Sequence, residues 1–390
     1  MIERRLHQYL HSLLQSNAAV VLVGPRQIGK TTLALKVTDS IKGVYRDLED
    51  PRDADQVRDI ILFAEQYPNQ LIILDEIQRL PNLFAPLRVI IDQRRRTGQP
   101  YGQFLFLGSA SLDLLGQTSE SLAGRVAHAE LVGINVLELE KTKQSLGTLW
   151  LRGGFPESLL SPNDNTSIQW RGDLIRSYLE RDIPQFGFRI PAETLRRFWT
   201  MLAHHQGGLL NAAQLAASLG VSGQSIARYL DILVDLLLVR RLQPWFANVG
   251  KRLVKSPKIY IRDSGILHAL LGLSSKEQLL SHPVLGASWE GFAIENLVNV
   301  CKDYQPYFYR TSAGAEIDLI LVRGGKPVIA IEVKRASAPK LKKGFYLACS
   351  DLGITNKYIV YPGQKSYTLP ENIQVIPLLE LMRILQDDEL

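Results

Sequence analysis

The chain opens with short, wholly apolar runs separated by polar segments. Three such runs, at residues 18–23, 71–74 and 104–107, lie in the first third of the sequence. A continuous apolar run bounded by polar residues is typical of a strand buried on both faces of a parallel sheet. The pattern therefore predicts an α/β fold whose N-terminal part is built on a parallel sheet.

The first run leads into a phosphate-binding loop. The sequence GPRQIGKTT at residues 24–32 matches the pattern G-x-x-x-x-G-K-[ST], and a helical segment follows it. Glycines let backbone N–H groups converge on phosphate oxygens, and the helix N-terminus favours the anion. We expect Lys30 to reach the β- and γ-phosphates and Thr31 to ligate Mg²⁺. The predicted nucleotide contacts are Gly24, Pro25, Arg26, Gln27, Ile28, Gly29, Lys30, Thr31 and Thr32.

The next two runs also end in polar residues. The second ends in Asp75, expected to hold Mg²⁺ through water, and Glu76, expected to act as general base. The third ends in Ser109, which is either a γ-phosphate sensor or the N-cap of a helix. Arg125, in the sequence SLAGR, is the candidate arginine that neutralises charge in phosphoryl transfer, in its own or a neighbouring subunit. The alternative for Arg125 is a structural ion pair.

These motifs occur in a particular order: GPRQIGKTTL, LIILDEIQRLP, FLGSASLDLL, SLAGR and then LRGGFPESLL. In that order they resemble the AAA-type ATPases that carry a domain of unknown function at the C-terminus. The resemblance spans nearly the whole chain and implies ATP binding and hydrolysis with Mg²⁺. It does not identify what the hydrolysis is used for.

Helical periodicity continues after the ATPase motifs. Residues 146–205 predict a helical lid segment, and residues 206–285 predict a winged-helix domain. In the latter, Asn211 and Ser222 are expected to cap two helices joined at Gly220, which is the spacing of a helix-turn-helix. The segments VRRLQPW and KIYIRD are expected to form the strands of the wing.

A winged helix suggests contact with DNA, although such domains also bind proteins. The second helix would present groove contacts, and the wing would present phosphate contacts. Asp231 and Asp235 on the same helix argue against DNA because they would repel phosphate. The candidate DNA-binding residues are Gln224, Ser225, Arg228, Arg240, Arg241, Lys251 and Arg252.

The C-terminal segment, residues 286–390, predicts a helix followed by a β-hairpin. Asp318 lies on one predicted strand, and Glu332 and Lys334 lie two positions apart on the next, so these two share a face. This arrangement resembles the PD-(D/E)xK nuclease superfamily, with Glu295 on the preceding helix as a further ligand. The resemblance implies Mg²⁺ bound by Asp318, Glu332 and Glu295, with Lys334 orienting water. Charged residues alternating on an exposed strand are the alternative.

Composition adds the location of the charge. The 390 residues carry a net charge of +6. Residues 1–145 hold 17 basic and 17 acidic side chains, residues 286–390 hold 12 and 12, and residues 146–285 hold 16 and 10. The excess in the middle suits a polyanionic partner, or is uneven surface charge without a partner. Two cysteines and no long apolar segment indicate a cytoplasmic protein without membrane spans.

Together these patterns predict four parts: an AAA-type ATPase domain at 1–145, the lid at 146–205, the winged helix at 206–285 and the α/β nuclease-like domain at 286–390. We expect an ATP-hydrolysing, homo-oligomeric DNA-processing ATPase, with a hexameric ring as one form of the oligomer and branched DNA as one substrate. The alternatives are a nucleotide-dependent regulatory switch with an inert C-terminal domain, and a defence nuclease gated by ATP.

Overall fold

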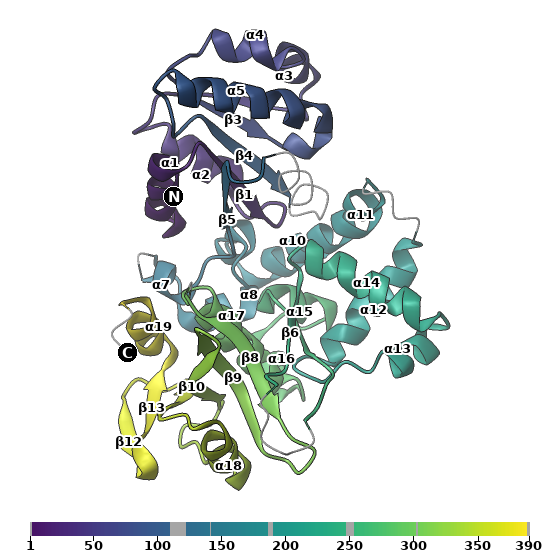
Figure 1. Cartoon of the computed structure of the whole chain (residues 1–390). Helices are drawn as coiled ribbons and strands as arrows, with labels where there is room; N and C mark the ends of the chain where they lie inside the picture. The colour runs from purple at the N-terminus through teal and green to yellow at the C-terminus, as the bar shows by residue number, and fades with distance from the viewer. Residues whose placement is uncertain are drawn as a thin grey trace. The chain divides into compact units, whose positions relative to one another are not determined.

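The computed structural model describes residues 2–109, 122–140, 142–185, 190–246, 253–301 and 303–387, with the side chains of residues 109 and 185 excepted. The chain divides into two compact units. One comprises Met1–Gly133 with Asp235–Leu237, and the other comprises Ile134–Val234 with Leu238–Leu390. Figure 1 draws the elements of both units along the chain.

Five parallel strands form the sheet of the N-terminal unit, in the order β2-β3-β4-β1-β5. They are β1 (Ala19–Gly24), β2 (Gly43–Asp47), β3 (Leu71–Asp75), β4 (Phe104–Ser109) and β5 (Val126–Glu130). Every residue of β1 and β3 is buried, as expected for strands covered on both faces. Because the strands are parallel, Gly24 and Asp75 end at the same edge of the sheet. The predicted α/β class with a parallel-sheet ATPase domain is confirmed.

Short helices cover this sheet. They are α1 (Leu6–Ser16), α2 (Lys30–Val37), α3 (Pro51–Gln56), α4 (Ile60–Glu65), the 3₁₀ turns η1 (Ile77–Arg79) and η2 (Pro81–Leu83), and α5 (Phe84–Arg96). Helix α2 begins at Lys30, directly after the left-handed Gly29 at φ 97°. A left-handed residue at that position favours glycine, so the motif glycine also defines where the helix starts.

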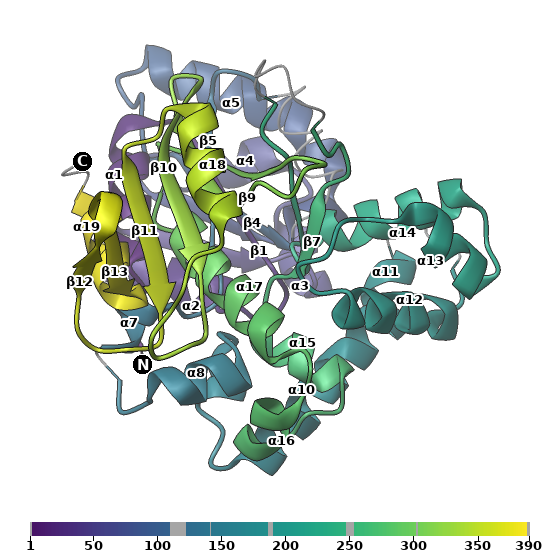
Figure 2. The ribbon, with the colours of Figure 1, turned by 90° about the horizontal axis from the view of Figure 1, so that it is seen from below.

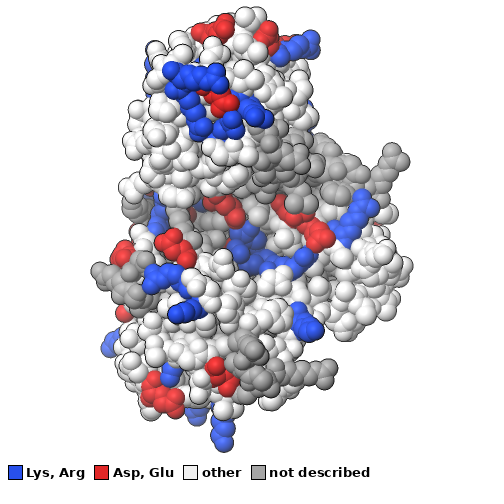
Figure 3. Space-filling model, viewed as in Figure 1, with Lys and Arg blue, Asp and Glu red and all other residues white. Residues whose placement is uncertain are grey.

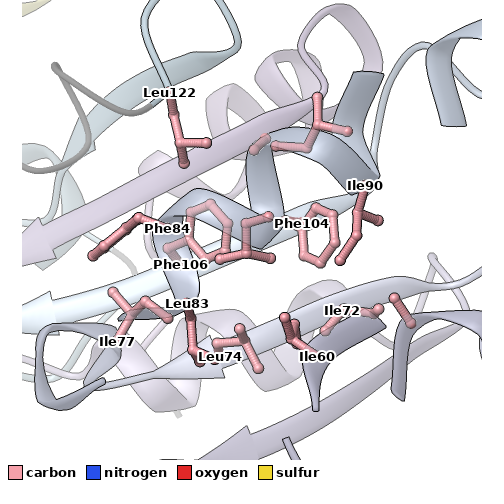
Figure 4. Packing of buried hydrophobic residues seen from close by; sticks show 14 of the residues in the cluster. Ile60, Ile72, Leu74, Ile77, Leu83, Phe84, Ile90, Phe104, Phe106 and Leu122 are labelled. Atoms are coloured by element: carbon pink, nitrogen blue, oxygen red, sulfur yellow. The ribbon is translucent and has the colours of Figure 1, made fainter. Parts of the chain in front are cut away.

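The core of this unit lies between β3, β4 and α5 (Figure 4). Phe104 and Phe106 on β4 stack with ring centroids 5.6 Å apart, and Phe84 of α5 meets Phe106 edge-on at 6.5 Å. Leu74 of β3 joins the same cluster. Burying each such side chain contributes about 1.5–3 kcal/mol, so this layer fixes the strands whose ends carry the polar residues.

Helices dominate the first part of the second unit. They are α7 (Val136–Leu139), α8 (Leu146–Arg152), α9 (Pro156–Leu159), α10 (Asp164–Ser177), the π-helical turn η3 (Tyr178–Asp182), α11 (Ile183–Gln185), α12 (Ala192–His204), α13 (Ala212–Leu219), α14 (Gly223–Asp235), α15 (Ser264–Leu270) and α16 (Lys276–Ser281). The expectation of a helical middle segment is confirmed.

Helices α13 and α14 have the capping expected from the sequence. Asn211 accepts from the backbone N–H of Gln214 at 3.0 Å, and Gly220 ends α13 in the left-handed region at φ 72°. Ser222 accepts from the N–H of Ser225 at 3.1 Å. The strands β6 (Val239–Leu242) and β7 (Lys258–Ile261) then pair antiparallel, and we call this pair the β6–β7 ribbon.

The second sheet has six strands in the order β12-β13-β11-β10-β9-β8. They are β8 (Gln305–Arg310), β9 (Glu316–Arg323), β10 (Lys326–Val333), β11 (Asn356–Tyr361), β12 (Tyr367–Leu369) and β13 (Ile373–Pro377). Strands β8, β9 and β10 are antiparallel neighbours, whereas β11 runs parallel to β10 and to β13. The C-terminal part is therefore a mixed α/β structure, as predicted.

Three further helices accompany this sheet: α17 (Leu285–Val298), α18 (Lys343–Leu352) and α19 (Leu378–Asp387), with the 3₁₀ turn η4 (Pro370–Asn372) before β13. Helix α18 packs on β9 and β10, and α19 packs on β11 and β13 (Figure 2). Helix α17 packs against β10 and α19. The predicted hairpin and the helix before it therefore belong to one layered structure.

Candidate functional site

The phosphate-binding loop follows β1 in the conformation that its glycines allow. Gln27 and Gly29 both have positive φ, at 60° and 97°. A Cβ at Gly24 would lie 2.5 Å from the carbonyl oxygen of Leu131, so this position accepts only glycine without a shift of backbone. Lys30 is buried at 6% exposure and donates to the carbonyl oxygens of Gly24 and Pro25, both at 3.0 Å.

A residue outside the motif also holds this loop. Arg4, just before α1, donates to the carbonyl oxygen of Ile28 at 3.1 Å and to that of Val132. Its guanidinium group therefore links the loop to the chain that follows β5. No sequence pattern pointed to Arg4, because it is separated from the motif by α1 and β1.

Asp75 lies beside the loop, at the end of β3, and is 5% exposed. Its Oδ2 accepts from the Thr31 hydroxyl at 2.7 Å and from the Tyr45 hydroxyl at 2.9 Å, and its Oδ1 accepts from the Glu76 N–H at 3.0 Å. Burial and the adjacent Asp75 carboxylate raise the pKa of Tyr45, which keeps it a donor. The predicted pair of Thr31 and Asp75 is thus brought together, and Tyr45 is a partner that sequence reasoning missed.

Glu76 has a left-handed backbone, with φ 52° and ψ 44°. This conformation is uncommon for a residue with a side chain and is typical of functional positions. Its carboxylate accepts from the amide of Gln78. The strand end thus turns sharply, and Glu76 follows directly on the residue that contacts Thr31.

Two arginines share one carboxylate near the loop. Arg26, from the loop itself, lies 3.6 Å from Glu49, and Arg79 of η1 pairs with the same Glu49 oxygen. Arg26 was predicted as a nucleotide contact, whereas Glu49 and Arg79 were not. The two arginines bring positive charge to the region between the ends of β2 and β3.

The remaining residues predicted for this site are Arg125, Ser109 and Thr32. Arg125 makes a two-pronged ion pair with Asp92, with both nitrogen–oxygen distances at 2.8 Å. This is the structural alternative stated for Arg125, and the pair raises the pKa of Arg125 and lowers that of Asp92. The side chain of Ser109 lies outside the described residues. Thr32 lies in the first turn of α2.

The candidate DNA-binding residues lie in different surroundings. Gln224 and Arg228 are exposed on α14, and Ser225 is half-buried beside Ser222, 3.0 Å between their hydroxyl oxygens. Lys251 and Arg252 lie outside the described residues. On the face drawn in Figure 3, basic and acidic side chains are interspersed in small groups among the described residues.

The two arginines of β6 are paired with carboxylates. Arg240 donates to both oxygens of Glu295, at 2.6 and 3.0 Å, and Arg241 pairs with Asp231. Arg262 donates to Glu295 as well, at 2.7 Å. Burial alone would raise the pKa of Glu295, but these two arginines outweigh it and lower the pKa to about 2. Glu295, predicted as a metal ligand, is therefore held by arginines.

Asp318 and Glu332 lie on the neighbouring strands β9 and β10, as predicted, and both are buried, at 6% and 7% exposure. Lys334 donates to Glu332 Oε1 at 2.6 Å. Asp318 Oδ2 accepts from the Val333 N–H at 3.1 Å. The structure thus brings these three predicted residues into one region.

Sequence reasoning missed the group at the centre of this region. Lys258, on β7, is 3% exposed, and its Nζ lies 3.3 Å from Glu290, 3.1 Å from Glu316 and 3.3 Å from Asp318. Tyr260 donates to Glu290 at 2.5 Å. We call Glu290, Glu316, Asp318 and Glu332 the carboxylate cluster.

Burial and mutual repulsion shape the electrostatics of the carboxylate cluster. Burial and the nearby Asp318 raise the pKa of Glu332 to about 8 against the opposing effect of Lys334. The same two causes raise the pKa of Glu290 to about 6. Burial acts to lower the pKa of Lys258, but attraction from the groups around it, including three carboxylates, leaves it well above its usual range.

The two regions differ in how well they suit a metal. At the loop, a hydroxyl and a carboxylate oxygen lie side by side, which are ligands that Mg²⁺ prefers. At the carboxylate cluster a lysine already contacts three of the four acids. Within the ranges that the structure describes, no three His, Cys, Asp or Glu side chains are arranged to hold a metal ion. The residues of the cluster thus do not fit an open divalent-metal site.

Three segments of the chain match models of known protein families. Residues 16–140 match the model of an AAA domain, residues 143–277 that of a domain of unknown function (DUF8612), and residues 285–381 that of another domain of unknown function (DUF4143). With the loop and the five-stranded parallel sheet, these matches define an AAA-type P-loop ATPase with a C-terminal domain of unknown function.

Two relatives match the whole chain. They are the uncharacterized protein Rv2008c of Mycobacterium tuberculosis and the uncharacterized protein Mb2031c of Mycobacterium bovis, each 44% identical over 391 residues, covering 100% of this chain and 87% of the relative. The chain belongs to the family of these two proteins.

Solved structures resemble the chain at low identity and low TM-score. The Walker-type ATPase paby2304 of Pyrococcus abyssi has a TM-score of 0.46 and 13% identity, over 70% of this chain and 96% of that chain. The RuvB Holliday junction branch migration motor of Thermotoga maritima has a TM-score of 0.30 and 17% identity, over 62% and 90%. Within the described residues, no helix is long and apolar enough to cross a membrane.

Proposed function

We propose that this protein is a magnesium-dependent ATPase that uses hydrolysis to act on DNA as a homo-oligomer. The contact between the Thr31 hydroxyl and Asp75 Oδ2, at 2.7 Å, carries the ATPase part. It joins the residue after the loop lysine to the end of β3, so both expected metal-holding groups lie together. AAA-domain membership supports the same conclusion.

In the proposed reaction, Lys30 leaves the carbonyl oxygens of Gly24 and Pro25 and neutralises the β- and γ-phosphates. Thr31 and Asp75 would hold Mg²⁺, which would supply charge neutralisation at the phosphates. Glu76 accepts a proton from the water whose oxygen attacks the γ-phosphorus, while the bond to the bridging oxygen breaks and ADP leaves.

The test of the ATPase part is phosphate release by Glu76→Gln. We expect the turnover rate to fall by roughly 10²-fold or more, because a general base contributes at least that much. Nucleotide binding, followed with a fluorescent ATP analogue, should remain. Glu65→Gln is the matched control, since Glu65 is exposed on α4. A Glu76→Gln protein with the unmodified rate would remove Glu76 from the mechanism.

The DNA part of the proposal depends on α14. Helices α13 and α14 have helix-turn-helix connection and capping, and Gln224 and Arg228 are exposed on the second helix. Arg240 and Arg241 contribute less than expected from the sequence because they are paired with Glu295 and Asp231. DNA contact is therefore assigned to the N-terminal half of α14.

Fluorescence anisotropy with duplex, forked and four-way-junction DNA tests this part. We expect Gln224→Ala with Arg228→Ala to weaken binding and to reduce the salt slope by about one. Arg176→Ala is the control, since Arg176 is exposed on α10. Unchanged DNA affinity and an unchanged salt slope would contradict DNA binding by α14 and would leave the ATPase proposal unaffected.

A nucleotide-dependent regulatory switch is the second candidate. The ion pairs of Arg240 with Glu295 and of Arg241 with Asp231 favour the switch, because they leave less positive charge to bind phosphate. Slow hydrolysis, stable ATP-bound assembly and no DNA affinity would support the switch. The third candidate, an ATP-gated nuclease, requires a metal at Asp318, where Lys258 lies.

The oligomer, with a hexameric ring as one form, remains part of the proposal through Arg125. To act on nucleotide in a neighbouring subunit, Arg125 would have to leave Asp92, to which it donates twice at 2.8 Å. An Arg125→Ala protein that assembles normally and hydrolyses ATP at the full rate would remove this role.

A further inference from the structure

The strongest unexplained feature of the second unit is the ammonium group of Lys258 inside the carboxylate cluster. Its Nζ lies 3.1–3.3 Å from one oxygen each of Glu290, Glu316 and Asp318. Those distances suit an N–H···O hydrogen bond, whereas Mg²⁺ requires about 2.0–2.1 Å to its ligands. The oxygens are therefore spaced for an ammonium group.

The strand that carries Lys258 is held in place on both sides. Its backbone pairs with β6, where Lys258 is opposite Leu242. The N–H of Ile259 donates to Gly208 at 3.1 Å, and the carbonyl of Ile259 accepts from Gly207 at 2.8 Å. Tyr260, two positions further, donates to Glu290 at 2.5 Å. Two side chains on one face of β7 thus enter the cluster together.

Both carboxylate oxygens of Asp318 have partners. Oδ1 contacts Lys258 at 3.3 Å, and Oδ2 accepts from the Val333 N–H at 3.1 Å. On the far side, Glu332 Oε1 accepts from Lys334, while its buried Oε2 has no hydrogen-bond partner among the described residues. Glu332 Oε2 could therefore accept a cation, but Oδ1 of the neighbouring Asp318 already contacts the lysine.

We propose that Lys258 is the resident cation of the carboxylate cluster, and that β7 places its ammonium group where a divalent metal would otherwise bind. With the ammonium group of Lys258 in place, the C-terminal domain does not bind a metal at Asp318. Removing the ammonium group opens a divalent-cation site made of Asp318, Glu332 and the acids that Lys258 now neutralises. The inference goes beyond the proposed ATPase and holds whether or not DNA is the partner.

The experiment is a Mn²⁺ titration of the full chain without nucleotide, followed by the electron paramagnetic resonance signal of free Mn²⁺. Each protein is compared with its own Asp318→Asn counterpart, so Mn²⁺ bound elsewhere cancels. We expect no Asp318-dependent Mn²⁺ in the unmodified protein and one per chain in Lys258→Met. Lys255→Met is the matched control, because Lys255 is exposed three positions earlier, and it should bind none.

A second measurement covers the risk that Lys258→Met folds poorly. Lys258→Gln keeps a polar side chain of similar length, and its melting temperature is measured with and without Mn²⁺. We expect Mn²⁺ to raise the melting temperature of Lys258→Gln more than that of Lys258→Gln combined with Asp318→Asn. In the unmodified protein and in Lys255→Met, adding Asp318→Asn should not change the effect of Mn²⁺.

Two results would overturn the proposal. The first is an Asp318-dependent Mn²⁺ in the unmodified protein, which needs no lysine variant to observe. The second is a folded Lys258→Met or Lys258→Gln protein that gains neither a bound Mn²⁺ nor thermal stabilisation by it.

Discussion

Two buried aspartates, one in each unit, lie on strands beside apolar residues, and their partners differ. Asp75 is 5% exposed and Asp318 is 6% exposed. The side-chain donors to Asp75 are the neutral hydroxyls of Thr31 and Tyr45, whereas Asp318 contacts the ammonium group of Lys258. Neutral donors orient a carboxylate without cancelling its charge, so Asp75 still attracts a cation. A lysine supplies the cation itself.

The sequence around an acidic residue thus indicates where its backbone lies but not which positively charged side chain meets its carboxylate. Both aspartates were predicted as metal ligands from their strands. Only the first has surroundings that leave this role open. The difference comes from side chains 30 and 60 residues distant in sequence, Tyr45 and Lys258.

The largest expected effect comes from removing the lysine. Lys258→Met leaves three carboxylates without their cation, and breaking a buried ion pair from one side costs about 3–5 kcal/mol. Denaturant unfolding should show this loss in the free energy of unfolding. Thr31→Val, which removes only a neutral donor from Asp75, should cost about 1 kcal/mol. Equal losses in the two variants would contradict the distinction.

The next effect separates the two aspartates by activity. Asp75→Asn should lower ATP turnover by about 10²-fold or more, since it weakens the group that holds the metal during phosphoryl transfer. Asp318→Asn should leave turnover unchanged. Steady-state phosphate release at saturating Mg²⁺ measures both, and a comparable loss in Asp318→Asn would show that the two sites act together.

Acid stability reports on a third carboxylate, that of the partly exposed Glu295. Its pKa is lowered to about 2 in the folded protein by Arg240 and Arg262. Its contribution is therefore fully present above the unfolded pKa of about 4.5 and is lost as pH falls toward 2; a shift of this size corresponds to about 3 kcal/mol. We expect the free energy of unfolding of the unmodified protein to fall between pH 6 and pH 2.5 by this contribution, and we expect Glu295→Gln to lack that part of the fall. The exposed Glu277→Gln, as control, should keep it.

The smallest effect concerns the hydroxyl that orients Asp75. Tyr45→Phe removes a 2.9 Å hydrogen bond but keeps the ring. Loss of an outer partner of a metal ligand typically costs 10–100-fold, so the apparent Mg²⁺ affinity for ATP hydrolysis should fall by about 10-fold. Tyr101→Phe, at an exposed tyrosine, is the control. A change in turnover at saturating Mg²⁺ with no change in Mg²⁺ dependence would assign Tyr45 another role.

Local patterns predicted much of the fold. Apolar runs located β1, β3 and β4, and capping residues such as Asn211 and Gly220 located α13. The C-terminal hairpin was also predicted from its own segment of sequence. These predictions succeed because each depends on residues within a few positions of one another.

Choosing among acids on one helix was beyond the sequence. Glu290 and Glu295 both lie on α17, five residues apart, so at 3.6 residues per turn they point about 140° from one another. Glu290 meets Lys258, and Glu295 meets Arg240 and Arg262. Which face of α17 turns toward the sheet depends on packing between distant segments, and no pattern within the helix distinguishes them.

The β6–β7 ribbon has a consequence for limited proteolysis. Arg240 and Tyr260 are paired across the ribbon, and they bond to Glu295 and Glu290 of α17, respectively. Isolated bridges also join Pro244 to Phe308 and Leu253 to Thr311. A cut between α16 and α17 should therefore leave two fragments that stay associated and protect the same amides from hydrogen exchange as the intact chain. A fragment that begins at Leu285, when produced alone, should lack part of its interior.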